Sequence, residues 1–226
     1  SNCNPPLSKT EALRCLDSAY KSYQPNNTEL TEYHLTELGS AQEMVSYYGD
    51  NIRYIPQFGK WLLWDGHRWC FDEIGDVNRL AKANALSQYD KVAQLDDFNQ
   101  RQQMSRYAAK SESRQAIEST IHLAKTEAGI PLRVEELDTN SYLLGVANGV
   151  INLQTGGLRV ETKEEYITKQ ATVVFNPDAT CPRWFEFLNE VMDGDNEMID
   201  YLKRIVGYSL TGDTKEQVLF FLFGHG

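Results

Sequence analysis

Two glycines, Gly224 and Gly226, have the spacing with which a phosphate-binding loop begins. They follow six consecutive apolar residues, Val218–Phe223. An apolar run of this length bounded by glycine is typical of a buried strand in a parallel sheet. The full loop pattern is G-x-x-x-x-G-K-[ST], so its lysine and its Mg²⁺-binding hydroxyl would lie beyond residue 226. The alternative is an ordinary core strand followed by a turn.

A second candidate site consists of four basic residues, Arg101, Arg106, Lys110 and Arg114. They lie 5, 4 and 4 positions apart, so in one continuous helix the last three would project from one face. Glu112 is the only acidic residue among residues 101–114. This pattern indicates contact with the backbone of a nucleic acid. A solvated helix face is the alternative, and the acidic composition of the chain favours it.

A third candidate is an aromatic hairpin that contains Trp61, Trp64, Trp69 and Phe71. Aromatic side chains can stack on the bases of a single strand. Alternation along a strand turns some of these rings inward, so we expect packing in the core to be their main use.

Other chemistry is not indicated by the spacing of residues. Acidic pairs occur where helices start or end, and there they serve as caps. His67 and Cys70 are three apart, but no C-x-x-C pair is present and the four cysteines are scattered. The sequence therefore predicts no catalytic group and no metal site.

Composition limits the class of protein. The chain has 226 residues, of which 41% are hydrophobic and 24% charged, as in ordinary globular proteins. No run is long enough to span a membrane and no signal peptide is present, so we expect a cytoplasmic protein with reduced thiols. The net charge of −10 argues against strong general binding of nucleic acid.

The first half of the chain shows helical and strand patterns in turn. Helical spacing of apolar residues predicts a helix over 38–48, ended by Gly49. A strand over 52–58 and a hairpin over 61–71 follow, with Asp65-Gly66 as the turn. Residues 76–128 lack glycine and proline and read as helical.

The second half returns to β patterns and then to helices. Short apolar stretches between turn residues predict a meander over 143–160, and β-branched residues predict a strand over 166–175. Pro182 and Asp195 are placed to start two amphipathic helices. The predicted fold class is therefore α+β, with helices and small antiparallel hairpin or meander elements.

Several stretches of the sequence resemble the phage and plasmid primase–helicases, superfamily 3 helicases related to the poxvirus primase–helicase. The resemblance runs from about residue 36 to the end, in the order of the family. The matching stretches are RYIPQFGKWLLWDG (53–66), KSESR (110–114), LGVANGVINLQTGG (144–157), CPRWFEFL (181–188) and YLKRIVGYSLTGDTKEQVLFFLFGHG (201–226).

The resemblance implies a layout of parts that ends at an AAA+ motor. Residues 31–180 would be an α+β N-terminal domain of the poxvirus-NTPase type, and residues 181–216 a helical linker or collar. The resemblance does not cover residues 1–30, whose Asn-Pro-Pro and Gln-Pro-Asn-Asn stretches predict a loosely attached extension. Residues 217–226 would be the first strand of the motor and the start of its phosphate-binding loop. Gly224 would be the first glycine of that loop, and Gly226 would lie inside the phosphate cradle.

The resemblance also implies the activity of the whole protein. Such proteins are similar to hexameric motors that unwind DNA with ATP and Mg²⁺ during phage, plasmid or prophage replication. The fragment alone would be inactive, because the catalytic lysine and metal ligands would lie beyond it. We expect it to assist ring assembly, DNA engagement, or both.

Two other interpretations stay open. The chain can be a pure oligomerisation or partner-docking module that does not touch nucleic acid, which the negative charge favours. It can also be part of an unrelated enzyme with a phosphate-binding loop, such as a small-molecule kinase. The long region before the glycines counts against a kinase.

Overall fold

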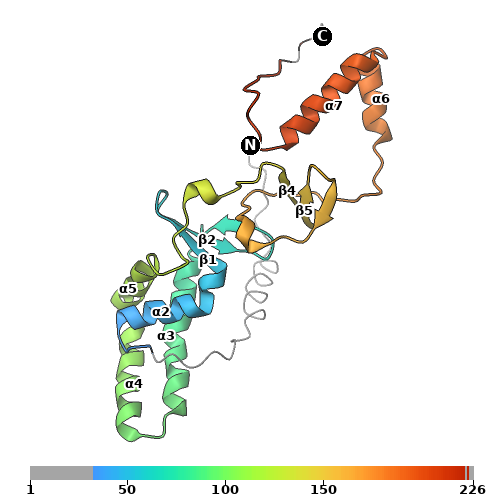
Figure 1. Ribbon diagram of the computed structural model, residues 1–226. Helices are drawn as coiled ribbons and strands as arrows, with labels where there is room; N and C mark the ends of the chain where they lie inside the picture. Colours follow the sequence, from blue (N-terminus) through green and yellow to red (C-terminus); the bar gives the residue numbers. More distant parts are fainter. Residues whose placement is uncertain (1–32, 222, 224–226) are drawn as a thin grey trace. The chain divides into compact units, whose positions relative to one another are not determined.

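The computed structural model describes residues 33–221 and 223. These residues contain six α-helices and two three-stranded antiparallel sheets, so the predicted α+β class is confirmed. Contacts divide the chain into two compact units, one ending at Glu136 and the other starting at Leu137, and each is described by itself (Figure 1). Within the described part of the chain, no helix is long and apolar enough to cross a membrane.

The first unit begins with helix α2, Glu37–Tyr48. Thr36 caps it by accepting a hydrogen bond from the N–H of Gly39 at 3.1 Å. The helix ends at Gly49, as the sequence predicts, and a short 3-10 helix, Gly49–Asn51, follows. Ala41 and Met44 are fully buried, whereas Leu38, expected on the same face, is half exposed.

Sheet A follows, with strands in the order β1 (Ile52–Ile55), β2 (Lys60–Trp64) and β3 (Trp69–Phe71). The predicted hairpin is confirmed, but its turn is one residue further on than expected. Asp65 pairs with Arg68 through a backbone hydrogen bond of 3.0 Å, so Gly66 and His67 are the central residues.

Asp65 closes this turn with its side chain. Its carboxylate accepts hydrogen bonds from the backbone N–H groups of His67 and Arg68, both at 2.8 Å. Gly66 has a φ of 104°, a conformation that glycine adopts without strain. Asp therefore flanks the turn, and glycine takes its first central position.

One face of sheet A packs on the helices of the first unit. Ile52, Trp61 and the partly buried Tyr54 and Leu63 belong to this face and contact the core cluster. The same cluster takes residues from α2 and from three other segments, among them Ile130. Residues 130–132 lie along β1, because Tyr54 exchanges backbone hydrogen bonds with Ile130 and Leu132 at 2.8 and 2.9 Å.

The other helices of this unit are α3 (Asp76–Gln94), α4 (Phe98–Ser111) and α5 (Arg114–Ala124). Helix α3 starts where the carboxylate of Asp72 accepts hydrogen bonds from the N–H groups of Gly75, Asp76 and Val77, at 2.7 to 3.0 Å. These bonds satisfy N–H groups that a helix start otherwise leaves without partners. A 3-10 helix, Val134–Glu136, ends the unit.

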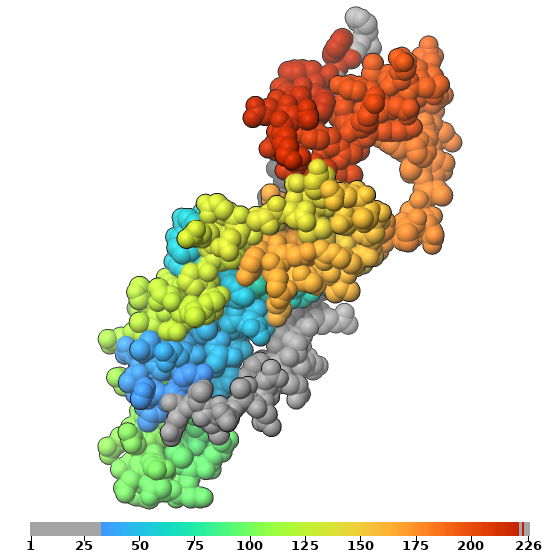
Figure 2. Space-filling model, viewed as in Figure 1, coloured from blue at the N-terminus to red at the C-terminus, as the bar shows by residue number. Residues whose placement is uncertain are grey.

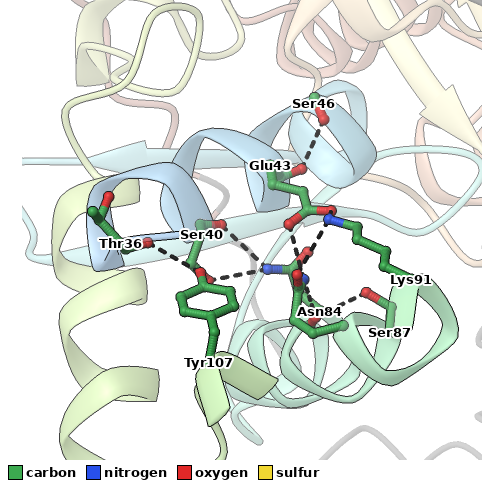
Figure 3. Close-up of polar contacts among 9 residues, drawn as sticks. Thr36, Ser40, Glu43, Ser46, Asn84, Ser87, Lys91 and Tyr107 are labelled. Atoms are coloured by element: carbon green, nitrogen blue, oxygen red, sulfur yellow. Dashed lines mark hydrogen bonds and ion pairs between the residues drawn. The ribbon is translucent and has the colours of Figure 1, made fainter. Parts of the chain in front are cut away.

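A buried polar layer joins α2 to α3 (Figure 3). The amide nitrogen of Asn84 donates to the carbonyl and hydroxyl oxygens of Ser40 at 3.2 and 3.3 Å. Gln88 donates to Glu43 at 2.8 Å, and Lys91 forms an ion pair with the same carboxylate. Because buried polar groups cost free energy when left unpaired, these pairs fix the register of the two helices.

Cys70 on β3 has a thiol that donates to the Asp65 carboxylate at 3.2 Å. Burial, and then the negative charge of Asp65, raise the pKa of Cys70 to about 12. Cys181, by contrast, is exposed.

We expect Cys70 to resist alkylation at pH 8. Its pKa of about 12 leaves roughly a thousandfold less thiolate than an ordinary thiol has, and the thiolate is the reacting form. Peptide-resolved mass spectrometry after a pulse of iodoacetamide would measure both rates, with Cys181 as the internal control. Equal rates at the two cysteines would contradict the assignment.

The raised pKa of Cys70 also predicts how the stability of the fold depends on pH. The folded pKa of Cys70 lies above 9.0, the ordinary value for a thiol, so the folded state holds this proton more tightly than the unfolded state does. The resulting stabilisation is complete below pH 9 and is lost as the pH rises toward 12.

The second unit contains sheet B, with strands β4 (Leu143–Val146), β5 (Gly149–Asn152) and β6 (Gly157–Arg159) in that order. The predicted meander is confirmed. Val146 pairs with Gly149, so Ala147 and Asn148 form a two-residue turn between β4 and β5.

Residues 166–175 form no strand, which corrects the prediction. They follow a short 3-10 helix, Lys163–Glu165, and run parallel to β4 with a single bridge between Gly145 and Gln170. The Asn148 side chain takes the place of further ladder bonds. Its amide donates to the carbonyl of Phe175 at 2.9 Å and accepts from the N–H of the same residue at 2.8 Å.

Two helices end the second unit, α6 (Pro182–Val191) and α7 (Asn196–Leu210). Their predicted starts are confirmed, since Pro182 opens α6 and Asp195 caps α7 by accepting from the N–H of Met198 at 3.1 Å. Only Leu188 and Ile199 are buried in them. The large apolar side chains that stay exposed are Trp184, Phe185, Phe187, Val191, Met198, Tyr201, Val206 and Leu210.

The described residues do not confirm the predicted strand at Val218–Phe223, which stays a prediction. Residues 218–221 and 223 form no strand, and Leu219, Phe221 and Phe223 are 80%, 82% and 97% exposed. A strand forms only with a partner for its backbone hydrogen bonds, and no described strand pairs with these residues.

Candidate nucleic-acid interface

Helix α4 carries most of the predicted basic site. Asp97 starts the helix by accepting from the N–H of Gln100 at 2.8 Å. Met104, Ala108 and Ser111 are buried, at spacings that place them on one side of the helix. Figure 1 shows α3 and α4 side by side, with their connecting loop at the end remote from sheet A. Since residues 98–111 contain no acidic side chain, the outer side of α4 is basic and polar.

The four predicted basic residues do not share one helix. The chain leaves the helix after Ser111, and Ser113 caps α5 by accepting from the N–H of Ala116 at 3.2 Å. Arg114 is therefore the first residue of α5, where it forms an ion pair with Glu118 at 2.7 Å. The premise that Arg106, Lys110 and Arg114 project from one helix face is wrong, because a serine cap breaks the helix between them.

Arg101 lies near the start of α4, where its side chain is bonded to the preceding loop. Its guanidinium donates to the backbone carbonyl of Leu95 through Nε at 3.0 Å and Nη2 at 2.5 Å. These bonds hold the side chain against the loop between α3 and α4, so Arg101 supports that loop.

Arg106 and Lys110 are the two cations of α4 that point to solvent. Both are exposed, and the side chain of neither makes a hydrogen bond or an ion pair with any described residue. The nearest acid along the chain, Glu112, hydrogen-bonds to Tyr89, which raises the pKa of the Tyr89 hydroxyl. Two unpaired cations one helical turn apart can contact successive phosphates of a nucleic acid.

A small cavity lies beside Lys110, between α2, α4 and α5. Its volume is about 30 Å³, enough for one or two water molecules and too small for a nucleotide. Tyr107 closes it by donating to the carbonyl of Thr36 at 3.1 Å, and burial raises the pKa of Tyr107. Sequence reasoning missed this cavity, since its hydroxyl side chains come from three separated segments. The residues that line it are Leu35, Thr36, Glu37, Ser40, Tyr107, Lys110, Ser111, Ala116 and Thr120.

The aromatic hairpin is not a stacking platform for bases. Trp69 is fully buried and Trp61 is 9% exposed, while Trp64 and Phe71 are partly buried. Trp64 contacts Trp69 in a tilted arrangement, with ring centroids 5.7 Å apart and an interplanar angle of 60°. The rings serve the core, as the alternation along the strands indicates.

The remaining predicted site is the phosphate-binding loop. Gly224 and Gly226 lie outside the described residues, so the phosphate-binding loop stays a prediction. Among the residues that are described, no group of three or more His, Cys, Asp or Glu side chains is placed to hold a metal ion.

Comparison with protein families gives a match over most of the chain. Residues 41–193 match the family model described as "D5 N terminal like". The match covers most of the chain and includes elements of both compact units, from α2 to α6. No curated protein matches the chain.

Proposed function

Because the chain belongs to the D5 N terminal like family, we propose that it is an accessory region of a phage- or plasmid-type replicative primase–helicase. Domains of this family are found in phage and plasmid primase–helicase proteins. In this proposal the region engages DNA and helps to assemble the ring, and a motor of the superfamily 3 type elsewhere in the protein hydrolyses ATP with Mg²⁺. The observation that carries the DNA contact is the pair of unpaired cations on α4, Arg106 and Lys110.

Ring assembly is supported by α6 and α7. These helices carry several exposed aromatic and aliphatic side chains, and exposed apolar side chains that gather on one element are typical of an interaction site. Trp184 and Phe187 stack on this surface with ring centroids 5.9 Å apart. We propose that α6 and α7 contact neighbouring subunits of a homo-oligomer, a hexamer in the complete protein.

The alternative is an oligomerisation or partner-docking module without nucleic-acid contact. The net charge of −10 favours it, because an acidic protein repels the phosphates of DNA. This alternative also predicts that α6 and α7 contact other subunits, but it predicts that α4 does not contact DNA.

Fluorescence anisotropy with labelled oligonucleotides at low and moderate salt tests the DNA contact. We expect micromolar binding that weakens with salt and falls at least tenfold in the double variant Arg106→Glu/Lys110→Glu, since two phosphate contacts become repulsions. Arg114→Glu is the matched control, because Arg114 is already paired with Glu118. Absence of binding at micromolar protein would favour the docking module, and light scattering would then report self-association. Binding that the double variant leaves unchanged would show that the DNA contact does not involve Arg106 and Lys110.

A further inference from the structure

The outer face of α4 carries two amide side chains as well as the two cations. Asn99, Gln103, Arg106 and Lys110 lie 4, 3 and 4 positions apart, and all four are exposed. This spacing places them in one line along the helix. We refer to these four residues as the α4 stripe.

The α4 stripe lies opposite the packed side of the helix. Met104 and Ala108 face the interior of the unit and are 5% and 0% exposed. In a helix each residue advances by about 100°, so the stripe points away from Met104 and Ala108. Arg101 falls near the packed side, which agrees with its bonds to Leu95. Figure 2 shows the green segment that contains α4 at the surface of this part of the molecule.

The chemistry of the stripe suits the edges of base pairs as well as phosphates. Asn and Gln amides can form paired hydrogen bonds with adenine, and Arg with guanine, in the major groove of DNA. Asn99 makes no hydrogen bond that fixes its amide among the described residues, and the same holds for Gln103. Their donors and acceptors are therefore available to a ligand.

The geometry also favours a duplex over a single strand. A helix about 10–12 Å across fits the major groove, which is about 12 Å wide. Recognition of single strands relies on exposed aromatic rings, and the tryptophans Trp61 and Trp69 of sheet A are buried. On α4, Tyr107 is partly buried and uses its hydroxyl on Thr36. Phe98, the first residue of α4, is 73% exposed, but at about 100° per residue it lies off the line of the stripe.

We infer that the α4 stripe binds double-stranded DNA by entering its major groove. Arg106 and Lys110 contact the phosphates at the groove edge or a guanine, and Asn99 and Gln103 meet base edges. Helix α3 packs along α4 and stays outside the groove, which lets α4 present a whole face. This inference rests on the proposed function, and it specifies the form of DNA.

The test compares a labelled duplex of about 20 base pairs, two helical turns, with a single strand of the same length, using the full chain. We expect the duplex to bind at least tenfold more tightly. Methyl green, which occupies the major groove, should compete, and distamycin, which occupies the minor groove, should not.

Two variants separate the roles along the stripe. Arg106→Glu/Lys110→Glu should lower duplex affinity at least tenfold and reduce the dependence of binding on salt. Asn99→Ala/Gln103→Ala should lower duplex affinity about fivefold with the salt dependence unchanged, since the amides carry no charge. Circular dichroism checks that both variants keep their helices.

The outcomes distinguish the inference from the proposed function. Equal or tighter binding to the single strand, or competition by distamycin alone, would overturn the inference. If binding to the single strand still depended on Arg106 and Lys110, the proposed DNA engagement would stand without it. Absence of binding to either form at micromolar protein would overturn both.

Discussion

Replacing Lys91 with Met should lower the free energy of unfolding of the first unit by about 2–3 kcal/mol. Lys91 is the ionic partner of Glu43, whose side chain is only 3% exposed. Without the ammonium group, a buried carboxylate keeps one hydrogen bond, from Gln88 at 2.8 Å, and no opposite charge. The cost falls below the largest values for buried pairs, because the Lys91 side chain is itself 36% exposed and water can reach its end.

Urea denaturation followed by tryptophan fluorescence would measure this loss, since Trp61 and Trp69 lie in the same unit. Lys91→Arg should recover most of the stability, as it keeps the charge. The double variant Glu43→Gln/Lys91→Met is the sharper control. It removes both charges and should be more stable than Lys91→Met alone, even though it differs from the native chain at two sites. A double variant less stable than Lys91→Met would refute the role given to the pair.

The polar layer also shows what sequence reasoning can and cannot recover. Apolar spacing was enough to predict α2, because Ala41 and Met44 repeat at helical intervals. It could not predict that Glu43, on the same helix, is buried. Its partners come from α3, more than 40 positions away, and nothing local to Glu43 marks a buried acid.

The candidate DNA site was predicted in part for a similar reason. The basic residues of α4 are visible as an acid-free stretch in the sequence. The break before Arg114 depends on Ser113 acting as a cap, and a serine followed by an amphipathic stretch is a local signal for the start of a helix. The ties of Arg101 to Leu95 and of Arg114 to Glu118 required coordinates, since only side-chain geometry separates a tethered cation from a free one.

The strand that was predicted over residues 166–175 failed for a different reason. Its β-branched residues fit a pleated surface, but β-propensity reports packing against neighbours more than a backbone preference. The segment does run along β4, and there the Asn148 side chain supplies two of the hydrogen bonds that a ladder would use. A side chain that replaces ladder bonds leaves no trace in the alternation pattern.

The second prediction with a large expected effect on stability concerns Gly149, at the start of β5 in sheet B. This residue has a φ of 148°, which side chains rarely adopt. An added Cβ would lie 2.4 Å from the backbone carbonyl oxygen of Arg159 on the neighbouring strand. Either β6 must move away or the β4–β5 turn must change, so Gly149→Ala should destabilise the second unit by about 3 kcal/mol, the sum of strain and overpacking.

Gly156→Ala separates these two causes. Gly156 also has a positive φ, 71°, but nothing lies within 4 Å of the Cβ that alanine would add. This variant should therefore cost about 1 kcal/mol, from backbone strain alone. Hydrogen exchange at the amides of β5 and β6 would report the difference, because the clash at Gly149 opens the ladder in which Val150 pairs with Arg159. Equal losses in the two variants would mean that sheet B tolerates the added methyl group and that the close approach of β6 does not constrain position 149.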